Sequence, residues 1–237
     1  MEIKRFKKRT VLKHETIQKD GSGVVPAINN LPKWYKDIPK VKEGVDPNFL
    51  PHQRTVKGCT PFLDSFTTGY QIVTLCDIGV TYKENDGKDC IAVTWEGNNP
   101  PLAGRNAEDS GKIPIPTGYV EEPFAWLFNT SLNFPKEYSI LVTHPLNRFD
   151  LPFLTLSAVI DGGWSIHSGN VPFFLKKDFV GIIPVGTPIA QLIPFKREKW
   201  EAKHSLNLFE ESLKNKVLSL NRHSWYKNTY WQRKTYK

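Results

Sequence analysis

The stretch VGTPIAQLIPFKRE, residues 185–198, decides the interpretation of this chain. Gly186 marks a turn, and the apolar run that follows is interrupted by one polar residue, Gln191. A turn followed by such a run predicts a strand of a hairpin. A glutamine amide both donates and accepts hydrogen bonds, so it suits either a backbone partner or the edge of a ligand. We expect a packed amide bonded to backbone.

Short apolar segments like this one recur along the chain at spacings of about ten residues, which is typical of β-sandwiches and barrels. Eighteen prolines and sixteen glycines are spread between them. The predicted strands lie in 69–82, 89–95, 124–134, 138–144, 153–161, 171–175, 179–185 and 188–195. The first two form a hairpin across the turn ENDGK, and residues 97–112 form a long, functional or mobile loop. The fold class is therefore mainly β, a β-clip or jelly-roll-like sandwich.

The flanking segments differ in composition from this β-rich domain, which we place at 57–203. Residues 1–56 are polar and proline-rich, and we expect an extended N-terminal arm that Trp34 and Tyr35 anchor on the body. One helix is predicted over 204–221, followed by a basic aromatic tail over 222–237.

The predicted helix carries apolar residues at helical spacing, namely Phe209, Leu213, Val217 and Leu220. Asn207 and Glu210 have the spacing of an N-terminal capping box. We expect this helix to pack its apolar side on the β body.

A second polar group stands thirty residues before Gln191, in the segment SAVIDGGW. Asp161 ends a predicted strand and is followed by two glycines, which let a ligand approach the backbone. Trp164 offers a flat stacking surface. A carboxylate in this setting holds a water or a hydroxyl group, so Asp161 and Trp164 are candidate ligand-binding residues.

The segments SAVIDGGW and VGTPIAQLIPFKRE together resemble the deoxyuridine triphosphatase and deoxycytidine triphosphate deaminase superfamily. The resemblance is good over residues 157–195 and loose over residues 134–156. The resemblance implies that Asp161 orients a water or the sugar hydroxyl and acts as the catalytic residue. It also implies that Trp164 stacks on the deoxyribose and that Gln191 contacts phosphate. Magnesium is the cofactor this alternative requires, and a trimer with sites between subunits would support it.

Two parts of the superfamily's pattern are missing. Its phosphate-binding Arg-Ser-Gly segment falls where this chain has THPLNR, residues 143–148, so only Arg148 supplies a charge. No glycine follows Gly186, so a glycine-rich C-terminal lid cannot be built. We therefore expect the fold without hydrolysis.

A broader resemblance covers most of the chain. The segments LPKWYKDIP (31–39), KGCTPFLDSFTTGYQI (57–72) and GTPIAQLIPFKREKW (186–200) resemble a family of uncharacterised tailed-phage proteins. This resemblance implies a viral source and transfers no activity.

Other site chemistries have less support. No apolar run is long enough to span a membrane, and no signal peptide is predicted. The cysteines, Cys59, Cys76 and Cys90, have no metal-site or disulfide spacing. His144 with Asp150, and His167 nearby, have the residue types of an iron site but lack its His-x-Asp spacing, so we predict no metal. Phosphate-binding glycine loops and nucleophile motifs are absent.

The two ends carry the basic character. Residues 1–13 and 222–237 each have a net charge of +5, which leaves −2 for the rest of a chain whose total is +8. The C-terminal end interleaves basic and aromatic residues, and its candidate partner-binding residues are Trp225, Tyr226, Tyr230, Trp231 and Arg233. Such residues dominate protein interfaces, and they also stack on nucleic-acid bases.

The sequence therefore predicts a non-enzymatic phage accessory or virion-associated protein that contacts other phage or host proteins, with a homo-oligomer left open. We expect it in the host cytoplasm or the virion, without a cofactor. The alternatives are a nucleotide-binding or hydrolysing protein with a degenerate site, and a nucleic-acid binder acting through its basic ends.

Overall fold

The computed structural model describes residues 10–19, 22–45, 54–85, 88–105, 108, 111, 113–167, 169–221 and 224–237. The chain forms two compact units, each built from two separate segments. The first unit combines Met1–Val25 with Gly69–Arg197, and the second combines Pro26–Thr68 with Glu198–Lys237. The two units are described separately.

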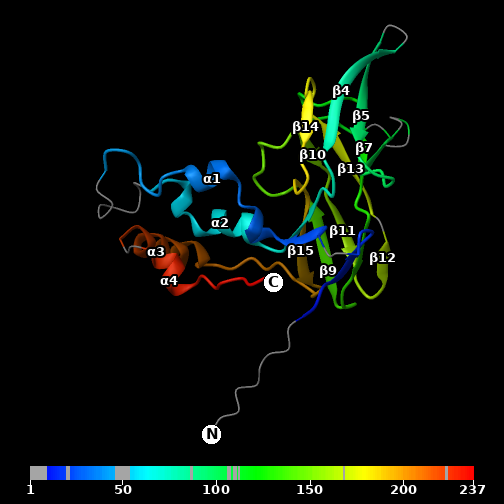
Figure 1. Cartoon of the computed structure of the whole chain (residues 1–237). Helices are drawn as coiled ribbons and strands as arrows, with labels where there is room; N and C mark the ends of the chain where they lie inside the picture. Colours follow the sequence, from blue (N-terminus) through cyan, green and yellow to red (C-terminus); the bar gives the residue numbers. More distant parts are fainter. Residues whose placement is uncertain are drawn as a thin grey trace. The chain divides into compact units, whose positions relative to one another are not determined.

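The first unit is mainly β, as predicted, and Figure 1 shows its strands. They are β1 (Lys13–Thr16), β2 (Val24–Pro26, at the border of the units), β3 (Tyr70–Val73), β4 (Ile78–Asn85), β5 (Lys88–Trp95), β6 (Leu102–Gly104), β7 (Phe124–Leu127), β8 (Thr130–Asn133), β9 (Tyr138–Thr143), β10 (Phe153–Thr155), β11 (Ala158–Asp161), β12 (Ser165–His167), β13 (Asn170–Leu175), β14 (Gly181–Ile183) and β15 (Pro188–Lys196).

These strands form four small sheets around one core. The strand orders are β1-β8-β12, β10-β13-β7-β6, β11-β9-β15-β3-β2 and β14-β4-β5. The pairs with a described register are antiparallel. Since buried side chains from all four sheets belong to a single cluster, the unit is a β-sandwich type of fold with a shared interior.

Trp126 on β7 lies at the centre of this core and is fully buried. Its ring stacks on Phe173 at a centroid distance of 3.8 Å and meets Phe153 edge-on at 4.9 Å. Its indole N–H donates to Thr155 Oγ1 at 3.1 Å, and the Thr155 hydroxyl donates to the Ile189 carbonyl at 2.6 Å. The polar atom of the largest buried side chain is therefore satisfied inside the core.

The predicted hairpin of 69–82 with 89–95 is confirmed for its main part. β4 and β5 pair in continuous register from Ile78 opposite Trp95 to Asn85 opposite Lys88. Ile78 and Val80 are buried, and Gly79 between them lies on the other face of the strand. This alternation is typical of a strand that packs only one of its faces on the core. The N-terminal part of the predicted strand is separate, because β3 belongs to a different sheet.

The turn at Gly186 is confirmed, but the hairpin predicted around it is wrong. Gly186 has a φ of +80°, and its N–H donates to the Thr74 carbonyl at 2.9 Å. The strands on its two sides do not pair: β14 pairs with β4, whereas β15 lies between β9 and β3. The turn therefore carries the chain from one sheet to another, and β15 becomes a central strand that is buried on both faces from Pro188 to Leu192.

Several strands were not predicted. β1 and β12 are short strands that flank β8, and β6 lies inside the segment predicted as the loop 97–112. Each has only three or four residues, too few for an alternating pattern to be recognised.

The second unit is helical in its described parts. Its helices are the 3₁₀ turns η1 (Ala27–Asn30) and η3 (Val56–Gly58) and the α-helices α1 (Lys33–Asp37), α2 (Thr60–Thr67), α3 (Leu208–Asn221) and α4 (Trp225–Thr229). The prediction of a single helix is therefore wrong in number: α1, α2 and α4 are additional. They have five to eight residues, fewer than the 11–18 over which helical periodicity is recognised.

Trp34 and Tyr35, on α1, pack on aromatic residues of α2 in the same unit. Tyr35 lies 4.9 Å from Phe66 between ring centroids, and Trp34 lies 5.7 Å from the same ring. Phe62 packs edge-on against Phe66 at 5.2 Å. Residues predicted as part of an extended arm thus belong to an aromatic cluster within the second unit.

The predicted helix exists as α3, Leu208–Asn221, in the second unit. The exposed fractions of Phe209 and Val217 are 75% and 55%. Asn207 precedes the helix with a φ of +69°, and its carbonyl accepts the Glu211 N–H at 3.2 Å.

Candidate functional sites

Gln191 is a structural residue, and the prediction of a packed, backbone-bonded amide is confirmed. It lies on the central strand β15 with no exposed surface. The Leu146 N–H donates to its Oε1 at 2.9 Å, so the amide holds the turn that follows β9. An amide buried in this way is not presented to a ligand in solution.

Arg148 lies in the same turn and is also engaged. Its Nε and Nη2 donate to the two Asp150 carboxylate oxygens, at 2.9 Å to Oδ1 and 2.8 Å to Oδ2. The Arg148 side chain is only 11% exposed. The planar, two-point geometry fixes the guanidinium, and the neighbouring carboxylate compensates its charge.

His144 completes this group of residues around the turn. Its Nε2 lies 3.0 Å from the Arg148 carbonyl, and its Nδ1 accepts the Thr155 N–H, with a separation of 3.3 Å. These partners require the neutral ring with its proton on Nε2. Burial lowers the pKa of His144 below its usual 6.5, against the smaller raising effect of the Arg148 carbonyl.

Both ring nitrogens of His144 are thus occupied, and Asp150 pairs with Arg148. His167 is exposed on β12, where its Nδ1 lies 2.9 Å from Ser131 Oγ. Within the described part of the chain, no cluster of three or more histidine, cysteine, aspartate or glutamate side chains is placed to hold a metal ion.

The lowered pKa of His144 predicts that stability falls in mild acid. The unfolded ring takes up a proton near its usual pKa of 6.5, whereas the folded ring does so only at lower pH. The unfolded state therefore binds more protons in this window, so the contribution of neutral His144 is complete above pH 6.5 and is lost as pH falls through the folded-state pKa. Urea midpoints measured between about pH 7.5 and pH 5 should decrease for the wild type.

His144→Gln should flatten this dependence, although it lowers stability overall. The control His14→Gln removes an exposed histidine instead. Equal pH slopes for the two variants would contradict the assignment to His144.

Asp161 and Trp164 form a separate group at the end of β11. Ser139 Oγ donates to Asp161 Oδ1 at 2.6 Å, and the Arg197 guanidinium lies 3.2 Å from Asp161 Oδ2. The Trp164 indole N–H donates to the Asp161 carbonyl at 3.0 Å, while 58% of the Trp164 surface is exposed. The carboxylate thus has partners that explain its position without a ligand.

The structure does not bring the four predicted ligand-binding residues together. Across β9, Asp161 is the neighbour of Ser139, whereas Gln191 is the neighbour of Thr143. Four residues along a strand correspond to about 13 Å. Gln191 and Arg148 therefore lie at one end of β9, and Asp161 and Trp164 lie at the other.

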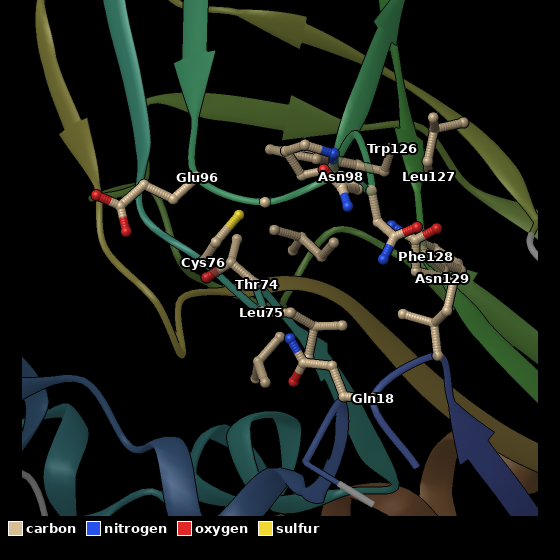
Figure 2. A pocket seen from close by; sticks show the side chains of 16 residues that line it. Gln18, Thr74, Leu75, Cys76, Glu96, Asn98, Trp126, Leu127, Phe128 and Asn129 are labelled. Carbon is tan, nitrogen blue, oxygen red and sulfur yellow. The ribbon is translucent and has the colours of Figure 1, made fainter. Parts of the chain in front are cut away.

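The sequence did not predict the pocket shown in Figure 2, which lies elsewhere in the first unit. Its volume is about 80 Å³, and it is lined by the ends of β3 and β7, the segments that follow β1, β3, β5 and β7, and Ile189 of β15. Trp126, Cys76, Glu96, Asn98 and Asn129 are among them. The predicted loop 97–112 was the one signal for it, since Gly97, Asn98, Asn99 and Pro101 contribute to the wall.

The pocket is too small for a nucleotide, because small-molecule sites usually enclose about 300–1,000 Å³. None of the four predicted ligand-binding residues lines it. Burial, followed by the Asp77 and Glu96 carboxylates, raises the pKa of the Cys76 thiol. A protonated thiol is a weak nucleophile, so Cys76 is not activated for covalent chemistry.

Of the five predicted partner-binding residues, Trp225 and Trp231 make contacts within the second unit, whereas Tyr226, Tyr230 and Arg233 are exposed. The Trp231 indole N–H donates to Asp64 Oδ2 at 2.9 Å, Lys234 pairs with the same carboxylate, and Trp225 meets Tyr230 edge-on at 5.0 Å. These contacts attach the C-terminal segment to α2 within the second unit. Tyr226 and Tyr230 remain 44% and 55% exposed, and Arg233 is exposed.

The basic residues 1–9 and Arg222, which carry much of the predicted charge at the ends, lie outside the described residues. Among the helices that the structure describes, none has the length and hydrophobicity needed to cross a membrane.

Comparisons with known proteins give little further information. No protein-family model matches this sequence, and a search of curated proteins found no match. One similar solved structure is a mutant dUTPase from phage phi11 of S. aureus. It is 14% identical, covers 44% of this chain and 96% of its own, and superposes with a TM-score of 0.25. Similarity at this level says nothing about the function of this chain.

Proposed function

We propose that this protein is a non-enzymatic binding protein that contacts other proteins through its C-terminal segment, as an accessory or virion-associated protein of a phage. The observation that carries the proposal is the exposure of Tyr226 and Tyr230 on a segment that is itself held in place. Tyrosine and arginine side chains supply a large share of binding energy in protein interfaces.

The rigidity of the segment supports this role. Trp231 and Lys234 share the Asp64 carboxylate, whose side chain is only 14% exposed, and the Lys234 ammonium lies 6.0 Å from the centre of the Trp231 ring. Binding costs less conformational entropy when the contacting side chains start from an ordered backbone. Tyr226 and Tyr230, on and directly after α4, are therefore presented as preorganised contacts.

The arrangement of the first unit argues for a function without nucleotide chemistry. Gln191 is bonded to backbone, and Arg148 is paired with Asp150. Asp161 is paired with Arg197 and lies beside the other end of β9. A triphosphate site requires several uncompensated donors that converge on the phosphates. Here Gln191, Arg148 and Asp161 each have a hydrogen-bonding or ion-pair partner within the protein instead.

The first experiment tests the absence of enzymatic activity. The full chain is incubated with each deoxynucleoside triphosphate and magnesium, and pyrophosphate release and the melting temperature are followed. We expect neither turnover nor a thermal shift. Turnover that Asp161→Ala abolishes would overturn the proposal in favour of a nucleotide hydrolase.

The second experiment tests the contact surface. The tagged full chain is incubated with an extract of infected host cells, and co-purifying proteins are cross-linked and identified. Tyr226→Ser with Tyr230→Ser should remove a stoichiometric partner, whereas Lys227→Ser, a change on the same short helix, should retain it. Capture of nucleic acid that weakens steeply with salt would instead indicate binding through the basic ends.

A further inference from the structure

Within the described part of the second unit, helix α3 is left uncovered over most of its length. Each residue from 201 to 219 is exposed, so the helix contacts solvent on all sides over most of its length. Isolated helices of fewer than about 12–15 residues are marginally stable in water, and α3 has 14 residues. A helix of this length gains most of its stability from a packed apolar face.

The apolar face of α3 is a narrow stripe. Phe209, Leu213 and Val217 follow one another at intervals of four residues and are 75%, 44% and 55% exposed. Residues at this spacing lie above one another on one side of a helix. The stripe, Phe209 to Val217, has the form of a helix-pairing seam.

Glu210 borders the first half of the stripe, whereas Lys214 and Lys216 border its second half. Glu210 and Glu211 lie in the first turn, and Lys214 and Lys216 lie further along the helix. Glu210 and Lys214 are four residues apart and therefore border the stripe along the same edge. An identical helix running in the opposite direction presents lysine where this helix presents glutamate.

We propose that the occupant of this stripe is α3 of a second copy of the chain, packed antiparallel around a twofold axis at Leu213. Phe209 then meets Val217 of the second copy at the same height, and Leu213 meets its own equivalent. In an antiparallel pair each edge faces the same edge of the partner helix, so Glu210 faces Lys214 of the second copy. This ion pair occurs twice. Antiparallel helix dipoles also attract each other.

The size of the contact predicts a weak dimer. Fourteen residues form a helix about 21 Å long, and one pair of such helices buries less than the roughly 1,200 Å² of a standard interface. Association should therefore depend on concentration within the range of sedimentation experiments. This inference is independent of the proposed partner-binding segment, because it uses no residue of α4 or the C-terminal tail.

The test is sedimentation velocity of the full chain over a hundredfold range of concentration. We expect a monomer–dimer equilibrium for the wild type and only monomer for Leu213→Glu, which places two carboxylates at the twofold axis. The control Leu208→Glu makes the same change on the opposite side of α3 and should keep the dimer. Glu210→Lys should weaken the dimer, and Glu210→Lys with Lys214→Glu should restore it, because the exchanged charges pair again.

The orientation is tested by cross-linking in a background of Cys59→Ser and Cys90→Ser, which removes the exposed cysteines. Leu213→Cys should form a disulfide-linked dimer. Val217→Cys should not link to itself, because an antiparallel pair separates these positions by about 12 Å. A wild type that stays monomeric, a dimer unaffected by Leu213→Glu, or efficient linkage through Val217→Cys would each overturn the proposal. A monomeric wild type whose stability falls on Leu213→Glu would also overturn the proposal, because the stripe would then be covered by its own chain.

Discussion

Replacing Trp126 by alanine is expected to lower the free energy of unfolding of the first unit by about 3–5 kcal/mol, the usual range for a fully buried tryptophan. The variant loses the stacked contact with Phe173 and the edge contact with Phe153. It also removes the donor to Thr155 Oγ1 inside the core. Small domains have a free energy of unfolding of about 5–15 kcal/mol, so the expected loss is a large part of the stability of this unit. Urea denaturation followed by circular dichroism measures the change.

The control for this prediction is Trp164→Ala, which makes the same change where 58% of the side-chain surface is already exposed. Its expected cost is about 1 kcal/mol, mainly from the hydrogen bond to the Asp161 carbonyl. Trp126→Phe retains the stacking but not the N–H donor, so it should fall between the two. Equal losses for Trp126→Ala and Trp164→Ala would show that the described core is wrong.

Replacing Gly69 by alanine is the second large effect, and we expect a loss of about 2–5 kcal/mol. Gly69 has a φ of +79°, a conformation that costs an alanine about 1–2 kcal/mol. The added Cβ would also collide with the backbone carbonyl oxygen of Leu192. Leu192 is paired with Tyr70 in the ladder between β15 and β3, so this oxygen cannot move without disturbing a central strand.

Gly118→Ala separates the two contributions to this loss. Gly118 has a similar φ of +87°, but a Cβ placed there meets nothing within 4 Å. The cost at this position should therefore be only the conformational one, about 1–2 kcal/mol. The difference between the two variants, measured as the change in urea midpoint, reports the contact with Leu192. If the variants lose the same amount, the close approach of Gly69 to β15 is not real.

The predicted strands were found with good accuracy where they carry enough residues to show a pattern. β5, β9, β13 and β15 lie within two residues of their predicted bounds, because alternating or continuous apolar residues are a local property of the chain. Apart from β14, which lies inside the predicted strand 179–185, the three- and four-residue strands were missed or merged with neighbours for the same reason. A segment that short contains too little periodicity to be distinguished from a turn.

The candidate ligand-binding site was predicted less well than the strands, although the environment of Gln191 was predicted correctly. A packed, backbone-bonded Gln191 was expected because the superfamily's phosphate-binding segment and glycine-rich lid are missing, and the Leu146 N–H is the backbone partner. The grouping of Gln191 with Asp161 depended on strand pairing. Pairing register joins residues that are distant in the sequence, and the residues themselves do not encode it locally.

The sequence by itself determined the mainly β class of the first unit, the turn at Gly186 and the buried amide of Gln191. Each of these follows from neighbouring residues, since period, turn chemistry and hydrogen-bonding need are local. Only the tertiary structure decided that the turn at Gly186 joins two sheets, that Asp161 and Gln191 lie beside opposite ends of β9, and that residues 26–68 and 198–237 form a second unit. These features depend on contacts between distant segments, and such contacts are fixed by the packing of the whole chain.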